Sequence, residues 1–179
     1  MNFREWILTA HRWLGLSSAI VLIVAGGTGA MLLWPNLFGR WPDQLHETLA
    51  VGRPGRYIVL AATAAAVALQ LSGLYLWWRT RRFRVRTTMG WGRFSTDLHH
   101  AVGALGLVLM LLLPVTALGR VAGRQLDSQQ QYKDLRQSVS DLHTTRGFSF
   151  PVKLLYAAAS AGFVIQGVTG ITMWWRSRR

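Results

Sequence analysis

The sequence contains no cysteine, so it can form neither a disulfide nor a thiolate metal site nor an iron–sulfur cluster. Acidic residues are also scarce, because seven Asp and Glu stand against 20 Lys and Arg, which gives a net charge of +13. No glycine-rich turn follows a predicted strand, so the fingerprint of a flavin or nicotinamide nucleotide site is missing. These absences leave histidine as the main residue type with which the chain can do metal chemistry.

The apolar residues gather in four long runs. They occupy approximately residues 7–34, 57–78, 101–118 and 152–175. Runs of about 20 apolar residues are long enough to cross a hydrocarbon core of about 30 Å. The first run is longer than the h-region of a signal peptide, and no small-x-small cleavage site follows it, so we expect it to remain in the protein. The pattern predicts an all-α membrane protein with four transmembrane helices.

The segments between the runs are short and polar. We expect short extracytoplasmic helices in the loops, one around residues 43–51 and one mostly helical stretch over residues 126–143. Pro54 and Pro151 suit the first turn of the helices that follow them. Pro114, deep in the third run, predicts a kink there. Residues 1–179 are therefore expected to form a single transmembrane domain with no separate soluble domain.

Positive charge marks one side of the membrane. The segment from Arg79 to Thr96 carries six arginines and no acid, and the C-terminal Trp-Trp-Arg-Ser-Arg-Arg adds three more. Cytoplasmic loops are enriched in Lys and Arg. We therefore expect both termini and the 79–96 loop to lie in the cytoplasm, and we interpret the charge as a topology signal that gives no reason to expect a nucleic-acid partner.

The chain also repeats itself. Residues 44–82 and 141–179 align without a gap and share Leu-His, then Pro, then Gly, then Trp-Trp-Arg-x-Arg-Arg. Histidine, proline and tryptophan are rare enough that composition alone does not explain the match. The sequence therefore predicts two copies of one structural unit.

The two remaining runs align as well, with His11 opposite His99. The matched pairs include Gly15 with Gly103 and Thr28 with Thr116. The halves, approximately residues 1–82 and 95–179, would each be a two-helix unit that starts on the same side. Such a repeat is parallel, with its pseudo-twofold axis along the membrane normal.

All five histidines lie in or beside the expected spans. His11, His99 and His100 lie near the cytoplasmic ends, and His46 and His143 lie near the outer ends. The repeat makes two pairs, His11 with His99 and His46 with His143. Because ionisable residues in a membrane mark sites by default, both pairs are candidate binding sites.

Two opposed neutral imidazoles can hold both axial positions of one haem iron. A histidine-only zinc site needs three or four ligands at one level, whereas each level here offers two or three. The count favours haem b, one group per level and two per chain, with His100 as an alternative ligand to His99. The competing interpretation is that the histidines are merely amphipathic residues at the membrane interface.

Other polar residues lie beside these histidines. Asp97 and Asp141 each precede a histidine by two residues and are candidates either to hydrogen-bond the rings or to cap a helix. A set of arginines near the cytoplasmic face is expected to anchor lipid headgroups or to pair with haem propionates: Arg79, Arg81, Arg82, Arg176, Arg178 and Arg179.

Four motifs carry a family resemblance. They read LTAHRWLGLSSAIVLIVAGGTGAMLLW, SGLYLWWRTRR, TDLHHAVGALGLVL and TGITMWWRSRR. Together they resemble the PepSY-associated transmembrane (PepSY-TM) family of bacterial inner-membrane proteins, which includes ferric-siderophore reductases and iron-regulated membrane proteins. The resemblance implies a haem-binding core that passes electrons across the membrane, with His11, His99, His46 and His143 as iron ligands. Better-known members carry large extracytoplasmic PepSY domains, whereas this chain has only short loops.

We therefore expect a haem b-binding membrane protein that carries electrons across the membrane to reduce extracytoplasmic ferric iron or an iron chelate. It would be either an oxidoreductase resembling ferric reductases or an electron-transfer subunit. With no nucleotide fingerprint, the electron donor would be quinol or a redox partner protein, and the acceptor a chelate or an extracytoplasmic partner. The alternative is a non-enzymatic membrane anchor or assembly subunit. A metal-ion transporter is disfavoured, because the span interiors contain few polar ligands.

Overall fold

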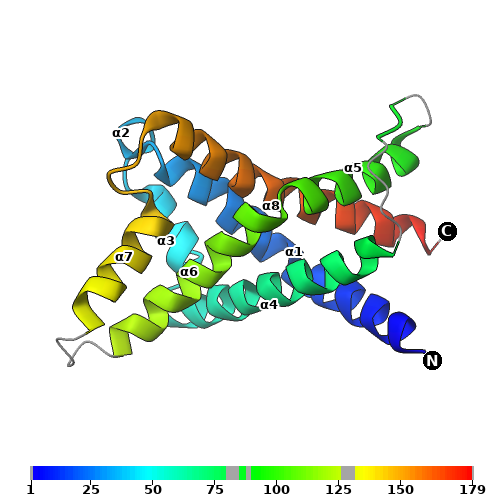
Figure 1. Cartoon of the computed structure of the whole chain (residues 1–179), viewed down its shortest axis with the longest axis horizontal. Helices are drawn as coiled ribbons and strands as arrows, with labels where there is room; N and C mark the ends of the chain where they lie inside the picture. The colour runs from blue at the N-terminus through cyan, green and yellow to red at the C-terminus, as the bar shows by residue number, and fades with distance from the viewer. Residues whose placement is uncertain (1, 80–84, 88–89, 126–131, 179) are drawn as a thin grey trace.

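The computed structural model describes residues 2–79, 85–87, 90–125 and 132–178, and within these ranges every regular element is a helix (Figure 1). The helices in chain order are α1 (Phe3–Leu32), α2 (Pro35–Phe38), α3 (Trp41–Thr48), α4 (Arg53–Trp78), α5 (Trp91–Leu105), α6 (Leu107–Gln125), α7 (Lys133–Thr144) and α8 (Phe150–Arg176). The prediction of an all-α protein is confirmed for the described residues.

The long helices begin where the local sequence favours a helix start. In α1 the Asn2 side chain accepts a hydrogen bond from the Glu5 amide at 2.9 Å, and the Glu5 carboxylate accepts one from the Asn2 amide at 3.0 Å. This reciprocal arrangement is a capping box, which satisfies two backbone donors that have no partner within the helix. Helices α4 and α8 carry Pro54 and Pro151 in their first turns, as predicted.

Three helices are long and apolar enough to cross a membrane on their own: α1, α4 and α8. A fourth candidate span consists of α5 and α6 together. Large apolar side chains point outward from these helices, since Ile20, Leu105 and Val108 are each more than 70% exposed. Such side chains would be costly in water but are at home in lipid, so the helices contact the bilayer.

The fourth candidate span is bent at a break between two helices. Helices α5 and α6 are bent by 67° with respect to each other, and the break falls at Gly106. A Cβ atom at Gly106 would lie 2.8 Å from the Val102 carbonyl oxygen and 3.0 Å from Met110 Sδ, so only glycine fits in this bend. The sequence did not predict this break, because Pro114, where a kink is expected, lies eight residues further on, inside α6.

The loop helices agree in part with the prediction. Helix α3 confirms the short helix expected around residues 43–51 and begins two residues earlier. Helix α7 confirms the C-terminal part of the polar helical stretch, whereas residues 126–131 lie outside the described residues. The short α2, which starts at Pro35, was not predicted.

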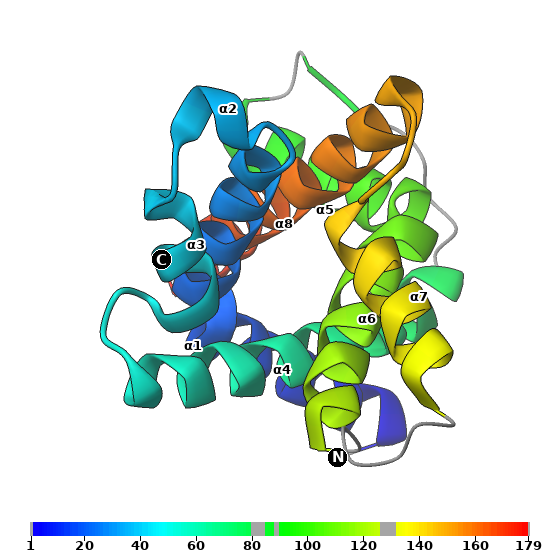
Figure 2. The ribbon, with the colours of Figure 1, turned by 90° about the vertical axis from the view of Figure 1, so that its left-hand side faces the viewer.

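The chain termini and the short loop helices lie at opposite ends of the molecule. Both termini lie at one end, and α2, α3 and α7 lie at the other (Figures 1 and 2). Helix α1 packs against α8 and α4, α5 packs against α8, and α4 packs against α6. The α1–α8 contact is so close at Gly26 that a Cβ atom there would lie 2.6 Å from the Ser160 carbonyl oxygen. The buried centre contains Ala66, Met110, Ala159 and Phe163.

Candidate functional site

The structure brings four of the five histidines together as two pairs. The ring centroids of His11 on α1 and His99 on α5 are 6.5 Å apart. Those of His46 on α3 and His143 on α7 are 6.3 Å apart. His100 follows His99 on the same helix, where consecutive side chains point in directions roughly 100° apart. The geometry therefore places His99, rather than His100, opposite His11.

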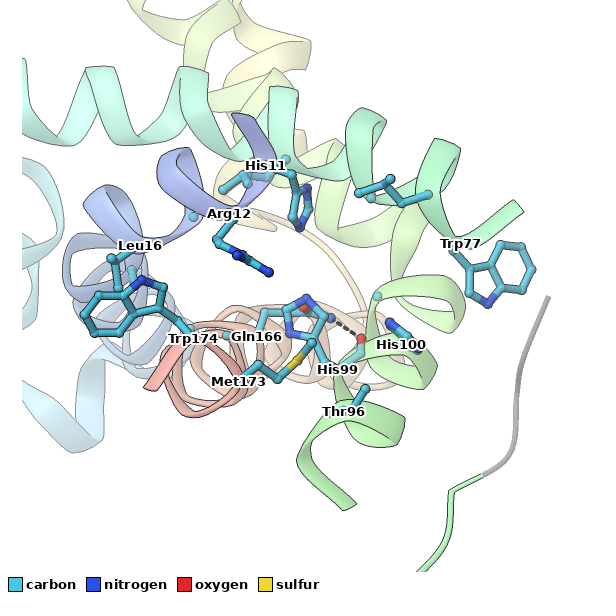
Figure 3. Close-up of a pocket in the computed structure, with 18 of the residues that line it drawn as sticks. His11, Arg12, Leu16, Trp77, Thr96, His99, His100, Gln166, Met173 and Trp174 are labelled. Carbon is cyan, nitrogen blue, oxygen red and sulfur yellow. Dashed lines mark hydrogen bonds between the residues drawn. The ribbon is translucent and has the colours of Figure 1, made fainter. Parts of the chain in front are cut away.

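The first pair faces a cavity of about 580 Å³ near the chain termini, which we name the terminal cavity. Figure 3 shows the His11 ring pointing from α1 towards the ring of His99 across this space. The cavity is lined by α1, α4, α5 and α8, and its wall is mostly apolar. His100 also lines it, and Gln166 holds the backbone beside the pair by donating to the His99 carbonyl oxygen at 2.8 Å.

The second pair faces a cavity of about 650 Å³ at the opposite end, which we name the loop cavity. Helices α3 and α7 supply the two histidines, while α1, α4 and α6 supply most of the apolar wall. Both volumes fall within the roughly 300–1,000 Å³ typical of small-molecule and cofactor pockets. The two cavities have only three lining residues in common among the described residues, Leu22, Ala66 and Phe163.

Hydroxyl groups orient the rings in the terminal cavity. His11 Nδ1 lies 2.8 Å from Ser72 Oγ, and His99 Nδ1 lies 2.9 Å from Thr169 Oγ1. Each hydroxyl already donates its own proton to a carbonyl of its helix, at Ala68 for Ser72 and at Ile165 for Thr169. The hydroxyls must therefore accept, so the proton of each ring lies on Nδ1 and donates to them.

Backbone carbonyls fix the same tautomer in the loop cavity. His46 Nδ1 lies 3.0 Å from the Ala25 carbonyl oxygen, and His143 Nδ1 lies 3.2 Å from that of Leu113. A carbonyl only accepts, so each Nδ1 must donate. Thr28 and Thr116 add a hydroxyl beside these rings, at 3.3 Å and 3.1 Å. All four rings thus keep a lone pair on Nε2, the atom that a metal would bind.

These hydrogen-bond partners occupy positions that the sequence repeat matches. Ser72 aligns with Thr169 in the same frame that aligns His46 with His143, and Thr28 aligns with Thr116 in the frame that aligns His11 with His99. From the sequence, Thr28 is matched with Thr116 but neither has an assigned role, and Ser72 is not singled out. The usable signal was that each of them is a hydroxyl residue in both copies of the repeat.

Burial keeps the second pair neutral. It lowers the pKa of His143 to about 4, and the nearby charges of Arg120 and His46 act in the same direction. Burial also lowers the pKa of His46. At physiological pH both rings are therefore uncharged, which is the form in which imidazole binds a metal.

The donor set fits haem better than a bare ion. Imidazole–metal bonds are about 2 Å long, so two bonds plus the half-width of each ring place the ring centroids roughly 6 Å apart when one metal lies between them. The observed separations are 6.5 Å and 6.3 Å. The described residues contain no group of three or more His, Cys, Asp or Glu side chains placed to hold an ion, whereas two axial imidazoles are sufficient for a haem iron.

Cationic side chains line the terminal cavity, as a carboxylate-bearing macrocycle would require. They are Arg4, Arg12 and Arg176, of which the sequence pointed to Arg176. The Arg178 guanidinium instead lies 4.4 Å from the centre of the Trp174 ring. Of the other arginines expected here, Arg81, Arg82 and Arg179 lie outside the described residues.

Neither aspartate plays the part expected from its position. Asp97 is inside α5 and caps nothing; its carboxylate accepts from Arg86 Nε at 2.9 Å and Nη2 at 3.1 Å. Asp141 is inside α7 and accepts from Gln137 Nε2 at 2.8 Å. Both predictions, the N-cap and the hydrogen bond to histidine, are wrong, because a hydroxyl or carbonyl already occupies each Nδ1.

The fold and these pairs define a class, a helical membrane protein with two opposed histidine pairs inside its bundle. The family model of the PepSY-associated TM region matches residues 34–130, more than half of the chain, so the chain belongs to this family. This confirms the resemblance seen in the span motifs. The matched stretch includes His46 and His99, one histidine of each pair. No match was found among curated proteins or among solved structures.

Proposed function

We propose that the chain binds two haem b groups and carries electrons across the bacterial inner membrane. His11 and His99 would ligate the iron in the terminal cavity, and His46 and His143 the iron in the loop cavity. One observation supports this most directly. In each cavity the centroids of two imidazole rings are separated by about the distance expected when one metal ion bridges them. In each ring Nδ1 is hydrogen-bonded, which leaves Nε2 available.

The protein's own residues would set the properties of the bound groups. Haem supplies a one-electron iron couple when bound. The hydroxyl and carbonyl partners of Nδ1 orient the rings and increase their electron donation, a role that outer-shell hydrogen bonds commonly play. The apolar walls exclude water and lower the local dielectric, and the burial of the site together with nearby charge tunes the reduction potential.

The distribution of positive charge supports an orientation in the membrane, and this orientation underlies the proposed direction of electron transfer. We propose that both termini lie in the cytoplasm, in a multi-pass inner-membrane protein built as a parallel twofold repeat. The terminal cavity would then receive electrons on the inner side from quinol or a redox protein. The loop cavity would deliver them outside, one electron per ferric ion reduced to ferrous, to an iron chelate or to an extracytoplasmic partner.

A visible spectrum of the purified protein tests the proposal. We expect a Soret band and a sharp α band after reduction with dithionite, with two haems per chain by pyridine haemochrome. A colourless protein that copurifies with another chain would instead favour a structural anchor.

Histidine variants test the pairing. His99→Ala and His143→Ala should each lose about half of the haem, whereas His100→Ala should retain both groups, because His99 is the residue opposite His11. Size-exclusion chromatography would verify that each variant remains folded. Full haem retention in both ligand variants would contradict the assignment.

A further inference from the structure

The loop cavity carries different charges on its two sides. Asp43 and Glu47 of α3 line the side that holds His46, whereas Arg120 of α6 lines the side that holds His143. The sequence repeat pairs Glu47 with Thr144, which also lines the cavity. The acids thus lie in the half of the cavity that also carries Arg56, whereas no acid from the half that carries Arg120 lines the described cavity wall.

Arg120 makes no ion pair and no hydrogen bond with any other described residue that the structure records, although it is half-buried in α6. The other arginine of the cavity, Arg56, has a carboxylate partner, since its Nη2 lies 3.8 Å from Glu47 Oε2. The positive charge of Arg120 lies close enough to lower the pKa of both His46 and His143.

Packing does not require an arginine at this position. The repeat matches Arg120 with Leu32 of α1, and Leu32 lines the same cavity. Neighbouring matched pairs, Gly29 with Ala117 and Leu33 with Val121, also line it and are small or apolar in both halves. A charged residue in a membrane-spanning helix is costly and marks a functional position by default. Arg120 is the charged member of these matched positions, and a ligand in the cavity would explain why an arginine stands there.

We propose that Arg120 binds a carboxylate in the loop cavity, on the α6 side beside His143. A guanidinium presents a fork of donors that matches a carboxylate in bidentate geometry. On the opposite side Arg56 is already paired with Glu47, and Asp43 adds a further negative charge, so an incoming carboxylate is favoured on the Arg120 side. The carboxylate would belong either to a propionate of a haem in the loop cavity or to an incoming iron chelate. The propionate assignment rests on the proposed function, whereas the chelate assignment does not.

The test compares Arg120→Leu, which copies the matched position in α1, with Arg120→Lys, which keeps the charge but loses the fork. Arg53→Leu is the control, because Arg53 is an exposed arginine at the same end that does not line the cavity. Arg120→Gln takes the place of the leucine variant if that variant aggregates. Two measurements are made on each: potentiometric titration with haem retention, and citrate binding followed by tryptophan fluorescence.

If the carboxylate is a propionate, Arg120→Leu lowers one of the two midpoint potentials, because removing a cation stabilises ferric over ferrous iron. It also increases haem loss from one site roughly tenfold, as expected for a lost charge-assisted hydrogen bond. If the carboxylate belongs to a chelate, both potentials stay fixed and the Kd for citrate rises roughly tenfold. Arg120→Lys should lie between the wild type and Arg120→Leu.

Unchanged potentials, haem retention and citrate binding would overturn the proposal and indicate that Arg120 extends its guanidinium to lipid headgroups. A colourless wild-type protein would overturn the proposed function instead. In that case citrate binding still tests the role of Arg120. A roughly tenfold weaker affinity for citrate in Arg120→Leu would support the proposal, and an unchanged affinity would refute it.

Discussion

Hydroxyl side chains and helix carbonyls determine which nitrogen of each histidine is available. Ser72 and Thr169 accept from Nδ1 of His11 and His99, because their own protons are committed to carbonyl groups. The same logic applies at the loop cavity through backbone oxygens. The tautomer is thus set by the fold, so the iron of the proposed haem groups would meet rings that are already oriented.

The clearest test of this idea is Thr169→Val, which keeps the shape of the side chain and removes the acceptor of His99. Loss of such an outer-shell partner commonly weakens metal binding about 10- to 100-fold. We expect faster haem loss from the terminal cavity and a higher potential for that haem, because His99 becomes a weaker electron donor. Haem transfer to apomyoglobin and potentiometry would measure both.

Thr172→Val is the matched control, since Thr172 lies on the same helix and bonds only its own backbone at Val168. Thr169→Ser should restore the wild-type values, because it restores the hydroxyl. If Thr169→Val and Thr172→Val behave alike, the hydrogen bond has no role in ligand orientation.

The buried His143 predicts a pH dependence of the haem-free protein. Its pKa is about 4 when folded, against about 6.5 for an exposed histidine. Between these values the unfolded chain binds a proton that the folded chain does not, so stability falls as the pH falls through this window, by at most about 3 kcal/mol. Thermal unfolding in detergent at pH 7 and pH 5 should show the loss, and His143→Gln should reduce it. An equal loss in the variant would contradict the role of this ring.

The sequence was sufficient to predict which histidines pair, but not what holds them. The repeat fixes the level of His46 and His143 in the membrane, because hydropathy and helix rise determine depth. Hydrogen-bond partners depend on how helices rotate against each other, and no local pattern encodes that rotation. Asp97 illustrates the limit: its position two residues before His99 suggested a partnership, whereas the folded chain brings Arg86 to it.

The bend between α5 and α6 has no counterpart in α1, the helix that the sequence repeat matches with this span. Helix α1 runs unbroken through the position matched with Gly106, which is Ser18. The bend lets Met110 fill the angle beside Gly106 and reach the buried centre, where it is fully buried. The sequence predicted a kink at Pro114, because proline is a strong local signal. It did not predict the bend at Gly106, because the close packing there is visible only in three dimensions.

Gly106→Ala should therefore destabilise the protein. The new Cβ would lie 2.8 Å from the Val102 carbonyl oxygen and 3.0 Å from Met110 Sδ, and overpacking of this kind costs about 1–3 kcal/mol. Gly27→Ala is the control, because nothing lies within 4 Å of its Cβ position. In α1 that change should be neutral or stabilising by up to about 1 kcal/mol. The measurement is thermal unfolding in detergent, and equal stability of the two variants would refute the packing argument.

The arrangement of the whole molecule makes its orientation directly testable. The terminal cavity lies at the end with both termini, and the loop cavity at the end with α3 and α7 (Figure 1). Because the chain has no cysteine, single cysteines can be introduced without background. With cytoplasmic termini, Ser138→Cys in α7 should react with a membrane-impermeant maleimide on intact cells, and Ser177→Cys only after lysis. Labelling in the reverse order would invert the direction proposed for electron transfer.

The wall between the two cavities has a consequence for energy conversion. Leu22, Ala66 and Phe163 face both cavities, and all three are apolar. They offer no donor or acceptor along which a proton could hop, whereas an electron can tunnel through one layer of side chains. With haem on either side, an electron passed outward through these residues would carry negative charge across the membrane with no proton following it through the same wall.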